Sequence, residues 1–450
     1  MDITTLLPQF GGFIWTIAAF VIALSVIVAI HEYGHYIVGR WCGIKADVFS
    51  LGFGPVLYAR NDKHGTRWQI AALPFGGYVK FAGDANAASG KDEEAMEEVA
   101  TDPVRLRETM HGAPLWARAL TVAAGPVFNF AMSIIIFAAI AMSIGTARDP
   151  LTVEAIKPMP NPIVGLEKGD VIQSIAGREM PASINTPEYR DYLDALPLEP
   201  VLEYTVLRDD APVTVSGPYP LPALVGSVGA ETAALAAGLK SGDVITGIDG
   251  TPTFAFQQLK NAVESSEGRP LALDVWRDGE ALAFTLVPKS TDEPQADGSF
   301  INVLRIGISS DSAITPATDT PSIGEAVNRG FAGTWRIMKG SVSGLWHMAT
   351  GAISSCNMSG PVGIAKVSGA MASQGAMSFI NFIAVLSTAV GLLNLFPIPA
   401  LDGGHLTFYA YEAVTGKPPS DGALRVLMTI GITLVLSLML FALFNDLFCP

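Results

Sequence analysis

Two histidines and a glutamate near the start of the 450-residue sequence have the spacing of a metal-dependent hydrolase. In the segment Ile30-His-Glu-Tyr-Gly-His35, a helix would place His31 and His35 one turn apart on the same face, so both imidazoles could bind one metal ion. A zinc site of this kind takes a third protein ligand and a water molecule, and Glu32 would accept the proton of that water as it attacks a carbonyl. The motif therefore predicts one Zn²⁺ ion and the hydrolysis of an amide bond.

The element that carries this motif is apolar along most of its length. Residues 11–41 contain almost nothing polar before His31, and the stretch is long enough to cross a bilayer. Arg40 and Trp41 mark the expected interface, which places His31 roughly 13 Å inside the membrane. Ionisable groups at that depth are costly unless they have a function. We therefore interpret residues 11–41 as a first transmembrane helix that carries a metal site.

Composition indicates membrane spans joined to acidic soluble domains. Half of the residues are hydrophobic, the mean hydropathy is positive, and the net charge is −14. This balance argues against a basic surface for nucleic acid, and no nucleic-acid partner is expected. The three cysteines, at positions 42, 356 and 449, leave the soluble middle without a thiol, so we expect no disulfide framework there and cannot infer the compartment from cysteine usage.

A basic segment follows the first predicted span. Lys and Arg recur from residue 40 to residue 118, whereas residues 1–12 contain neither, so the positive-inside rule predicts a cytoplasmic segment and an external N-terminus. We interpret residues 44–82 as a membrane-associated β-loop whose edge near Leu73 to Lys80 could pair with an extended peptide, although an ordinary cytosolic hairpin is the alternative. Residues 83–113 are predicted to be a cytoplasmic loop with an acidic, solvated part.

An internal repeat follows a second predicted span at residues 115–145. The sequence from Gly165 to Gly177 aligns without a gap with the sequence from Gly238 to Gly250. Each copy continues into a helical pattern and then a hairpin pattern, which resembles tandem PDZ domains over 150–217 and 218–290. Such domains bind extended peptides by adding a strand, and the alternative is a pair of spacers without a ligand. Two preceding spans would place both domains outside the cytoplasm.

The last third of the chain is predicted to return to the membrane. Residues 291–322 have the composition of a polar linker. In residues 323–372 apolar side chains first recur at every fourth position, which favours an amphipathic region on the membrane surface. Two further spans are predicted at 378–396 and 427–447.

The loop between these two spans, residues 397–425, contains the candidate third metal ligand in the motif Leu401-Asp-Gly-Gly404. Prolines and paired glycines interrupt a helix here at membrane depth, which is tolerated where the backbone lines a polar site. Asp402 and His405 both have side chains that suit zinc. We favour Asp402 and keep His405 as the alternative.

Several motifs together resemble the site-two protease family, and within it the bacterial regulator-of-sigma-E protease branch. The motifs that carry the resemblance, besides the PDZ-like repeats, are His31-Glu-Tyr-Gly-His35, Gly52-Phe-Gly-Pro55, Leu73-Pro-Phe-Gly-Gly-Tyr-Val79, Gly125-Pro126 with Asn129, and Leu401-Asp-Gly-Gly404. The resemblance implies a zinc intramembrane protease with His31, His35 and Asp402 as ligands and Glu32 as catalytic base. It also implies that Asn394 helps to hold the substrate or an oxyanion.

The resemblance further implies a substrate class and a location. The substrates would be single-span proteins of the anti-sigma factor type, first trimmed outside by another protease, and also remnant signal peptides. The enzyme would be a multi-pass protein of the bacterial inner membrane, with the zinc site within the lipid bilayer towards the cytoplasm. Two other functions are compatible with the residues: a membrane metal transporter, and a PDZ scaffold with a vestigial metal site. Glu32→Gln separates hydrolysis from transport, because a transporter need not depend on a base.

Overall fold

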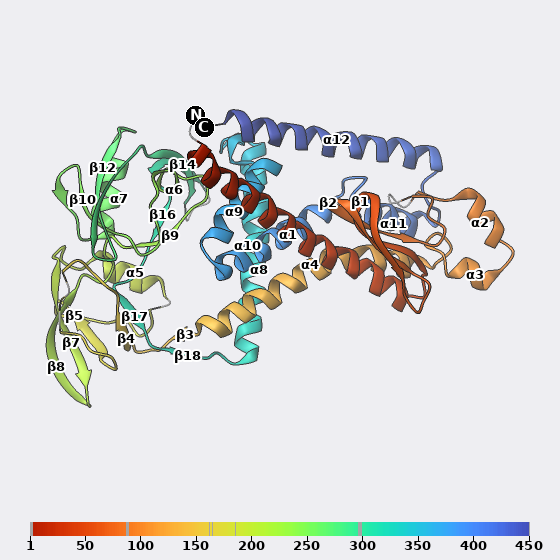
Figure 1. Ribbon diagram of the computed structural model, residues 1–450. Coiled ribbons are helices and arrows are strands. Elements are labelled where there is room, and N and C mark those ends of the chain that lie inside the picture. The colour runs from red at the N-terminus through yellow and green to blue at the C-terminus, as the bar shows by residue number, and fades with distance from the viewer. Residues whose placement is uncertain are drawn as a thin grey trace. The chain divides into compact units, whose positions relative to one another are not determined.

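A computed structural model describes residues 3–86, 90–161, 163, 165–184, 186–295 and 299–449. Residues 87–89 of the predicted acidic loop and 296–298 of the predicted linker lie outside this description. The chain forms two compact units, Met1–Ala141 with Ile323–Pro450 and Met142–Ser322, which Figure 1 shows as ribbons.

Four long apolar helices dominate the first unit, and each overlaps a predicted span (Figure 1). They are α1 (Ile3–Trp41), α4 (Leu115–Ile144), α10 (Ala376–Asn394) and α12 (Asp421–Phe448). Each is long and apolar enough to cross a bilayer. Many of their large apolar side chains are exposed, as expected for surfaces that contact lipid. The prediction of a multi-pass membrane protein with four spans is therefore confirmed.

The region 323–372, predicted as one amphipathic surface region, is divided into two helices and a short turn. These are α8 (Ile323–Ala349), η1 (Ser355–Asn357) and α9 (Pro361–Ser373). Small residues of α8 pack closely on α4, since a Cβ atom added at Gly330 would lie 2.4 Å from the carbonyl oxygen of Ile134. α9 packs on α1, where Gly369 meets Thr16. The apolar periodicity on which the prediction of a surface region rested does not indicate these small-residue contacts.

The segment 397–425 was predicted as a loop, but most of it is helical. α11 (Asp402–Thr415) begins at the candidate ligand, and the break in the helical backbone is confined to residues 395–401. Gly403 allows this tight return, because a Cβ atom there would lie 2.3 Å from the carbonyl oxygens of Leu395 and Phe396. The paired glycines therefore let a new helix start directly against the end of α10.

The predicted β-loop is a bent hairpin of β1 (Ala46–Asn61) and β2 (Arg67–Phe81). Residues 46–51 pair with residues 67–70 on one side and with residues 77–81 on the other, so the hairpin forms four short segments side by side. Segment 77–81 is an edge of this sheet and lies against α1. A Cβ atom added at Gly77 would lie only 3.0 Å from Cγ of Glu32. The hairpin thus brings a strand edge to the candidate site.

The insert after the hairpin contains two short helices, α2 (Glu93–Val99) and α3 (Pro103–Arg107). Asp92 and Asp102 cap their N-termini by accepting backbone hydrogen bonds. The inner half of the hairpin and the end of the insert share a core with α1 that includes Tyr36, Phe49 and Met110. The helix caps and this core therefore give a defined structure to part of a segment that its composition predicted to be solvated.

Two four-stranded antiparallel sheets, one for each copy of the repeat, organise the second unit (Figure 1). The strand orders are β6–β5–β7–β8 and β11–β10–β12–β13. The strands are β5 (Val171–Ile175), β6 (Arg178–Glu179), β7 (Val201–Arg208), β8 (Ala211–Pro218), β10 (Val244–Ile248), β11 (Thr251–Pro252), β12 (Leu271–Arg277) and β13 (Glu280–Leu286), and the helices are α5 (Pro187–Asp194), α6 (Ala233–Ala237) and α7 (Phe256–Glu264). The shared order of elements agrees with the internal repeat found in the sequence.

Each copy contains an ion pair between an arginine and a buried aspartate at the same position of the repeat. Asp170 and Asp243 occupy the same position in the repeated Gly-Asp sequence, and each carboxylate is 1% exposed. Arg208 forms two hydrogen bonds of 2.8 Å with Asp170, and Arg277 binds Asp243 in the same two-pronged way at 2.6 and 2.7 Å. Each aspartate also accepts a backbone N–H three residues earlier, which fixes the loop before the central strand.

The segment predicted as a polar linker, residues 291–322, instead contributes strands to both copies. A hairpin is followed by three short strands that pair with β9 (Val225–Val228), β4 (Val153–Ile156) and β3 (Thr146–Ala147). The strands of the segment are β14 (Lys289–Pro294), β15 (Phe300–Arg305), β16 (Ile308–Ser310), β17 (Ile314–Pro316) and β18 (Thr318–Asp319). Ile306 is buried in the core of the second copy and Ile314 in the core of the first. The polar residues around them made the segment resemble a linker in the sequence.

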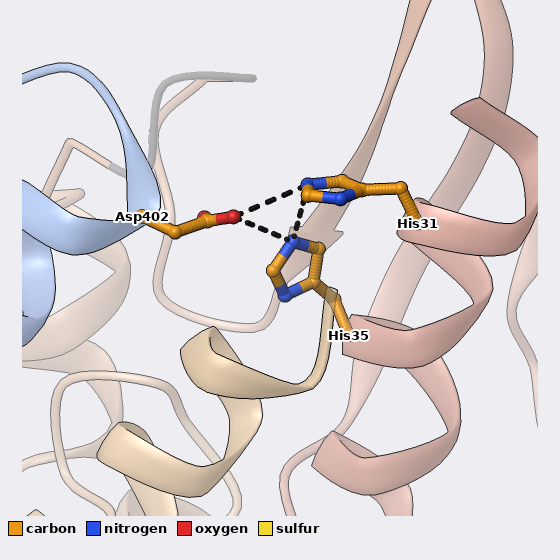
Figure 2. A group of neighbouring side chains, drawn as sticks. All are labelled: His31, His35 and Asp402. Atoms are coloured by element: carbon orange, nitrogen blue, oxygen red, sulfur yellow. Dashed lines mark hydrogen bonds and ion pairs between the residues drawn. The ribbon is translucent and has the colours of Figure 1, made fainter. Parts of the chain in front are cut away.

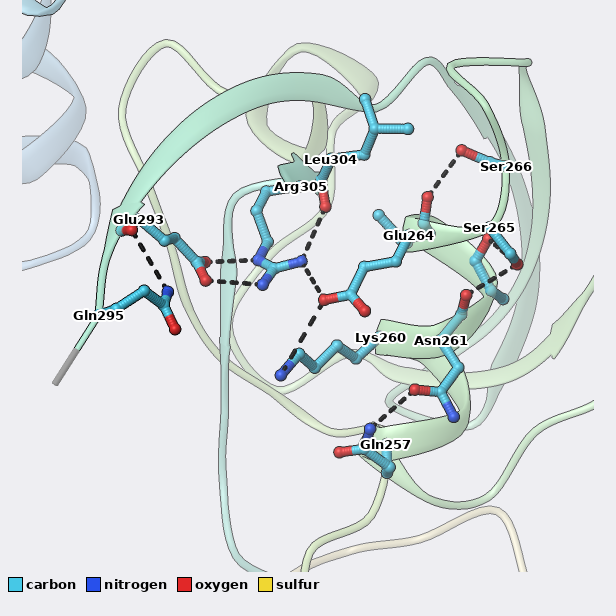
Figure 3. Close-up of polar contacts among 12 residues, drawn as sticks. Gln257, Lys260, Asn261, Glu264, Ser265, Ser266, Glu293, Gln295, Leu304 and Arg305 are labelled. Carbon is cyan, nitrogen blue, oxygen red and sulfur yellow. Dashed lines mark hydrogen bonds and ion pairs between the residues drawn. The ribbon is translucent and has the colours of Figure 1, made fainter. Parts of the chain in front are cut away.

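Arg305 fastens this hairpin to the second copy of the repeat, as Figure 3 shows. Its guanidinium lies 2.6 Å from Glu264 of α7 and also binds Glu293 of β14, with one bond of 2.7 Å. Lys260 adds a weaker contact, 4.0 Å from Glu264. The segment is therefore part of the folded unit.

The ion pair of the first copy gives a stability prediction. Asp170→Ala should destabilise this copy, because Arg208 and the backbone N–H of Glu167 both lose their charged acceptor. Amide hydrogen exchange of residues 171–175 in the full-length protein should then be roughly tenfold faster or more. Glu167→Ala is the matched control, since Glu167 binds the same arginine but is 67% exposed, and it should change exchange little. Equal effects of the two changes would contradict this account.

The same pair predicts a pH dependence. The hydrogen bond from Arg208 holds the pKa of Asp170 below its ordinary value, although burial acts in the opposite direction. A carboxylate whose pKa is lowered by folding stabilises the fold above its unfolded pKa, about 3.9, and loses this contribution as pH falls through the lower folded value. Protection of residues 171–175, corrected for intrinsic exchange, should decrease below about pH 4. Asp170→Ala should lack this decrease, and an unchanged decrease in the variant would exclude Asp170 as its source.

Candidate metal centre

Three side chains from two helices converge on one point in the first unit (Figure 2). His31 and His35 lie one turn apart on α1, and their Nε2 atoms are 3.2 Å apart. Oδ2 of Asp402, at the first residue of α11, lies 3.2 Å from Nε2 of His31 and 3.5 Å from Nε2 of His35. The three residues are buried or nearly so. The histidine pair predicted from helical spacing thus lies next to a carboxylate more than 360 residues away in the sequence. Spacing alone could not predict that this carboxylate would be Asp402.

The donor set fits a zinc ion by chemistry and by size. Ligand atoms about 2.0–2.1 Å from a tetrahedral ion lie about 3.3 Å from one another, which matches the three separations found here. Oδ2 of Asp402 is buried and has no hydrogen-bond partner among the described residues. A buried carboxylate oxygen without a partner is costly, and a cation removes that cost. Two imidazoles and one carboxylate leave a fourth position for water or substrate.

The outer nitrogens of both imidazoles face α4. Nδ1 of His35 lies 2.9 Å from the carbonyl oxygen of Thr121. Nδ1 of His31 lies 3.2 Å from the side-chain amide of Asn129, which is completely buried. When Nε2 binds a metal, Nδ1 carries the proton and needs an acceptor, so Thr121 suits His35 directly. Asn129 suits His31 once its amide presents Oδ1, which otherwise lacks a partner in the described part of the chain.

Gly125 permits this close approach of α4. A Cβ atom at Gly125 would lie 2.3 Å from Nε2 of His35 and 2.8 Å from Cε1 of His31, a severe clash with both rings. On the facing side, a Cβ atom at Gly34 would lie 2.6 Å from the carbonyl oxygen of Ala124. In the sequence, Gly125, Pro126 and Asn129 contributed only to the family resemblance. That resemblance did not identify Asn129 as a partner of His31, although Gly125 and Asn129 have the same four-residue spacing as the histidines.

A cavity of about 370 Å³ opens beside the three side chains. Its walls include all five residues predicted for the site, His31, Glu32, His35, Asn394 and Asp402. Further wall residues come from the strand edge at Gly77 to Phe81, from α4 and α11, and from the first half of α12. The structure therefore brings the five predicted residues together around one cavity.

His405 lines the same cavity but does not join the cluster. Among the described residues, only Asp402 completes a group with His31 and His35 whose ligand atoms all lie within 4.8 Å. His405 lies nearly one turn further along α11, where its ring contacts Phe408. Of the two candidates that the sequence left open, Asp402 is therefore the one directed at the imidazoles.

Asn129 generates a test of the α4 contact. Asn129→Ala removes the acceptor for Nδ1 of His31, so we expect metal affinity to fall about tenfold or more while the fold is kept. Zinc affinity can be measured by competition with a chelating dye on purified protein. Asn129→Asp should retain more affinity than Asn129→Ala, because a carboxylate oxygen still accepts the proton. Unchanged affinity in the alanine variant would show that α4 does not orient His31.

Comparisons with known proteins identify the family of the chain. Residues 19–438 match Peptidase family M50. The chain is 35% identical over 445 residues to a protein of Agrobacterium fabrum that is provisionally named a zinc metalloprotease, and the match covers 98% of each chain. It is 33% identical over 471 residues to the regulator of sigma E protease of Salmonella typhimurium, covering 96% of this chain and 98% of that protein. The chain therefore belongs to peptidase family M50 and is a zinc metalloprotease of the site-two protease type.

Proposed function

We propose that the protein is an intramembrane endopeptidase that uses one zinc ion bound by His31, His35 and Asp402. The convergence of two imidazoles and a carboxylate inside a membrane-spanning helix bundle carries this proposal. His31 is nine residues from Arg40 at the end of α1, a depth of roughly 13 Å. A metal site at that depth suits a bond that is itself within the membrane.

The residues around the cluster have complementary roles in peptide hydrolysis. When bound, zinc supplies Lewis-acid chemistry that polarises a carbonyl and activates water. Glu32 accepts the proton of the attacking water at its carboxylate and transfers it to the leaving amine nitrogen. Asn394, in the wall of the same cavity, donates a hydrogen bond to the substrate carbonyl or to the negative oxygen that replaces it.

The substrate would bind as an extended strand along the edge at residues 77–81. Among the described residues, that edge pairs with residues 46–51 on one side only, and it lines the cavity next to Glu32. Helical peptides hide their carbonyls in internal hydrogen bonds, so a transmembrane substrate must unwind, and strand addition replaces those bonds. The Salmonella relative is named for the regulation of sigma E. We therefore propose single-span substrates of the anti-sigma factor type, and remnant signal peptides, with prior trimming outside by another protease.

Two separate features support a periplasmic location for the N-terminus and for the repeat unit. Basic residues cluster after α1, which favours the cytoplasm for that end of the helix. Cys356 and Cys449 form a disulfide between the turn before α9 and the end of α12, and such bonds persist in oxidising compartments. α9 also contacts the first turns of α1 near Thr16. Both arguments therefore place the start of α1 and the end of α12 on the periplasmic side of a bacterial inner membrane.

The two repeats are proposed to be PDZ domains that restrict access by size. Each copy combines a four-stranded sheet with a helix, and the returning segment 306–319 adds a strand to each. The unit is inserted between the second and third spans, on the proposed periplasmic side. A bulky external domain of a substrate would collide with it, whereas a trimmed tail would pass or dock by strand addition.

Glu32→Gln tests the hydrolytic role. The change removes the base and leaves the three candidate ligands intact, so cleavage of a single-span substrate should fall at least 100-fold while zinc content is unchanged. Asp402→Ala is the matched comparison, since it should lose both zinc and cleavage. Both quantities can be measured on the same purified, detergent-solubilised samples. Full cleavage by Glu32→Gln would contradict the role of Glu32 as the base, and zinc binding without any cleavage by the unchanged protein would favour a metal transporter.

A clean deletion tests the size filter. β18 pairs with β3, so residues Thr146 and Asp319 are adjacent and the unit between them can be replaced by a short Gly-Ser linker. We expect the deleted protein to cut an untrimmed substrate that the intact protein leaves uncut, with cleavage of the trimmed substrate largely retained. Resistance of the untrimmed substrate in a deletion that still cuts the trimmed one would reject the filter and favour a docking role.

A further inference from the structure

A second cavity, of about 270 Å³, lies where α1 ends and β1 begins. Its walls contain the basic side chains Arg40, Lys45 and His64, together with Thr66 and the acidic residue Glu108. None of these residues belongs to the candidate metal centre or to its cavity. Basic side chains therefore outnumber acidic ones in the lining of this open cavity.

The position of this cavity along α1 is at the expected membrane interface. The apolar span of α1 ends at Trp41, whose side chain is 74% exposed, and Arg40 is the residue before it. Trp116, at the start of α4, is also largely exposed. Tryptophan rings at both ends of such helices sit at the level of lipid headgroups. The basic cavity is therefore at the depth where lipid phosphates lie.

The nearby Asp62 forms no ion pair with the basic side chains of the cavity among the described residues. The Asp62 carboxylate accepts hydrogen bonds from Tyr36 at 2.8 Å, from Trp68 at 3.1 Å and from two backbone N–H groups. Arg40 donates one bond to the Tyr36 hydroxyl, at 3.0 Å. Its other N–H groups and the Lys45 ammonium make no side-chain hydrogen bond or ion pair within the described ranges, so they are available to an anion.

A third cation lies beneath the wall of the cavity. Arg107 donates from Nη2 to the carbonyl oxygen of Cys42, at 3.0 Å, whereas its Nη1 is buried without a partner in the described structure. Nη1 lies 3.8 Å from the position of a Cβ atom on Gly43, which lines the cavity. Arg40, Lys45 and Arg107 therefore face a single opposing lining charge, that of Glu108, among the described residues. The excess is positive.

We propose that this cavity binds the phosphate of an anionic phospholipid headgroup. The guanidinium of Arg40 matches phosphate geometry, Lys45 supplies a second charge, and Trp41 lies beside them at the level of the acyl ester groups. Inorganic phosphate has the same chemistry, but a site at the end of a span favours the lipid source. Arg40 is linked through Tyr36 to the helix turn of His35, so a bound headgroup would also hold the end of α1 that carries the metal centre.

The test uses the full-length protein in nanodiscs of phosphatidylcholine with a minor fraction of phosphatidylglycerol. Native mass spectrometry measures the phosphatidylglycerol that remains bound on release into the gas phase. Arg40→Gln with Lys45→Gln should weaken this binding roughly 25-fold, about fivefold for each charge. Arg60→Gln with Arg67→Gln is the matched control, because it removes the same charge from exposed positions on the same hairpin outside the cavity. The control should change binding less than twofold.

Two further measurements make the result decisive. Arg40→Lys keeps the charge and should retain most of the binding, which separates loss of the site from loss of the fold. Titration of the detergent-solubilised protein with inorganic phosphate distinguishes the two sources of the anion. Equal losses in the two double variants would reduce the effect to general surface charge and overturn the proposal. A phosphate site that Arg40→Gln with Lys45→Gln abolishes, with lipid binding unaffected, would also overturn it.

Discussion

An ionised carboxylate and two imidazoles cannot remain at membrane depth without a partner for their buried polar atoms. Oδ2 of Asp402 has no hydrogen-bond donor of its own among the described residues, and it lies within 3.5 Å of both histidine nitrogens. A bound cation satisfies all three groups together. The arrangement of the first unit can be understood as the set of contacts that hold this cluster in place: α1 supplies the spacing, α11 begins at the carboxylate, and α4 supports the outer faces of the rings.

A second set of contacts keeps the helices around the cavity together at the opposite end. The Asp446 carboxylate, near the end of α12, accepts backbone hydrogen bonds from Gly360, Val362 and Gly363 at the start of α9. The Cys356–Cys449 disulfide joins the same two regions, and α9 packs along α1. α12 is thus fastened at its C-terminal end, while Met428 and Ile432 in its first half line the cavity. α12 is therefore attached to its neighbours at its C-terminal end and forms one wall of the cavity with its first half.

The sequence was sufficient where a local pattern carries the information. Four apolar stretches identified the spans, and four-residue spacing identified the histidine pair. It was insufficient where distant residues decide the outcome. Asp402 and His405 both suit zinc, and only the direction in which α11 starts separates them. The disulfide joins cysteines 93 residues apart. The strands within 291–322 have mostly polar sequences. Their few apolar residues, such as Ile306 and Ile314, are buried in the cores of the two repeat copies, and the local sequence does not indicate this.

The central claim is that two imidazoles and one carboxylate bind a single zinc ion within the membrane. X-ray absorption at the zinc edge of the purified full-length protein measures this most directly, because it reports the type and distance of the atoms bound to the metal. The account predicts two imidazole nitrogens and further oxygen ligands at about 2.0–2.2 Å, with no sulfur. A third imidazole would indicate His405 in place of Asp402. That result, or sulfur at about 2.3 Å, would contradict the account.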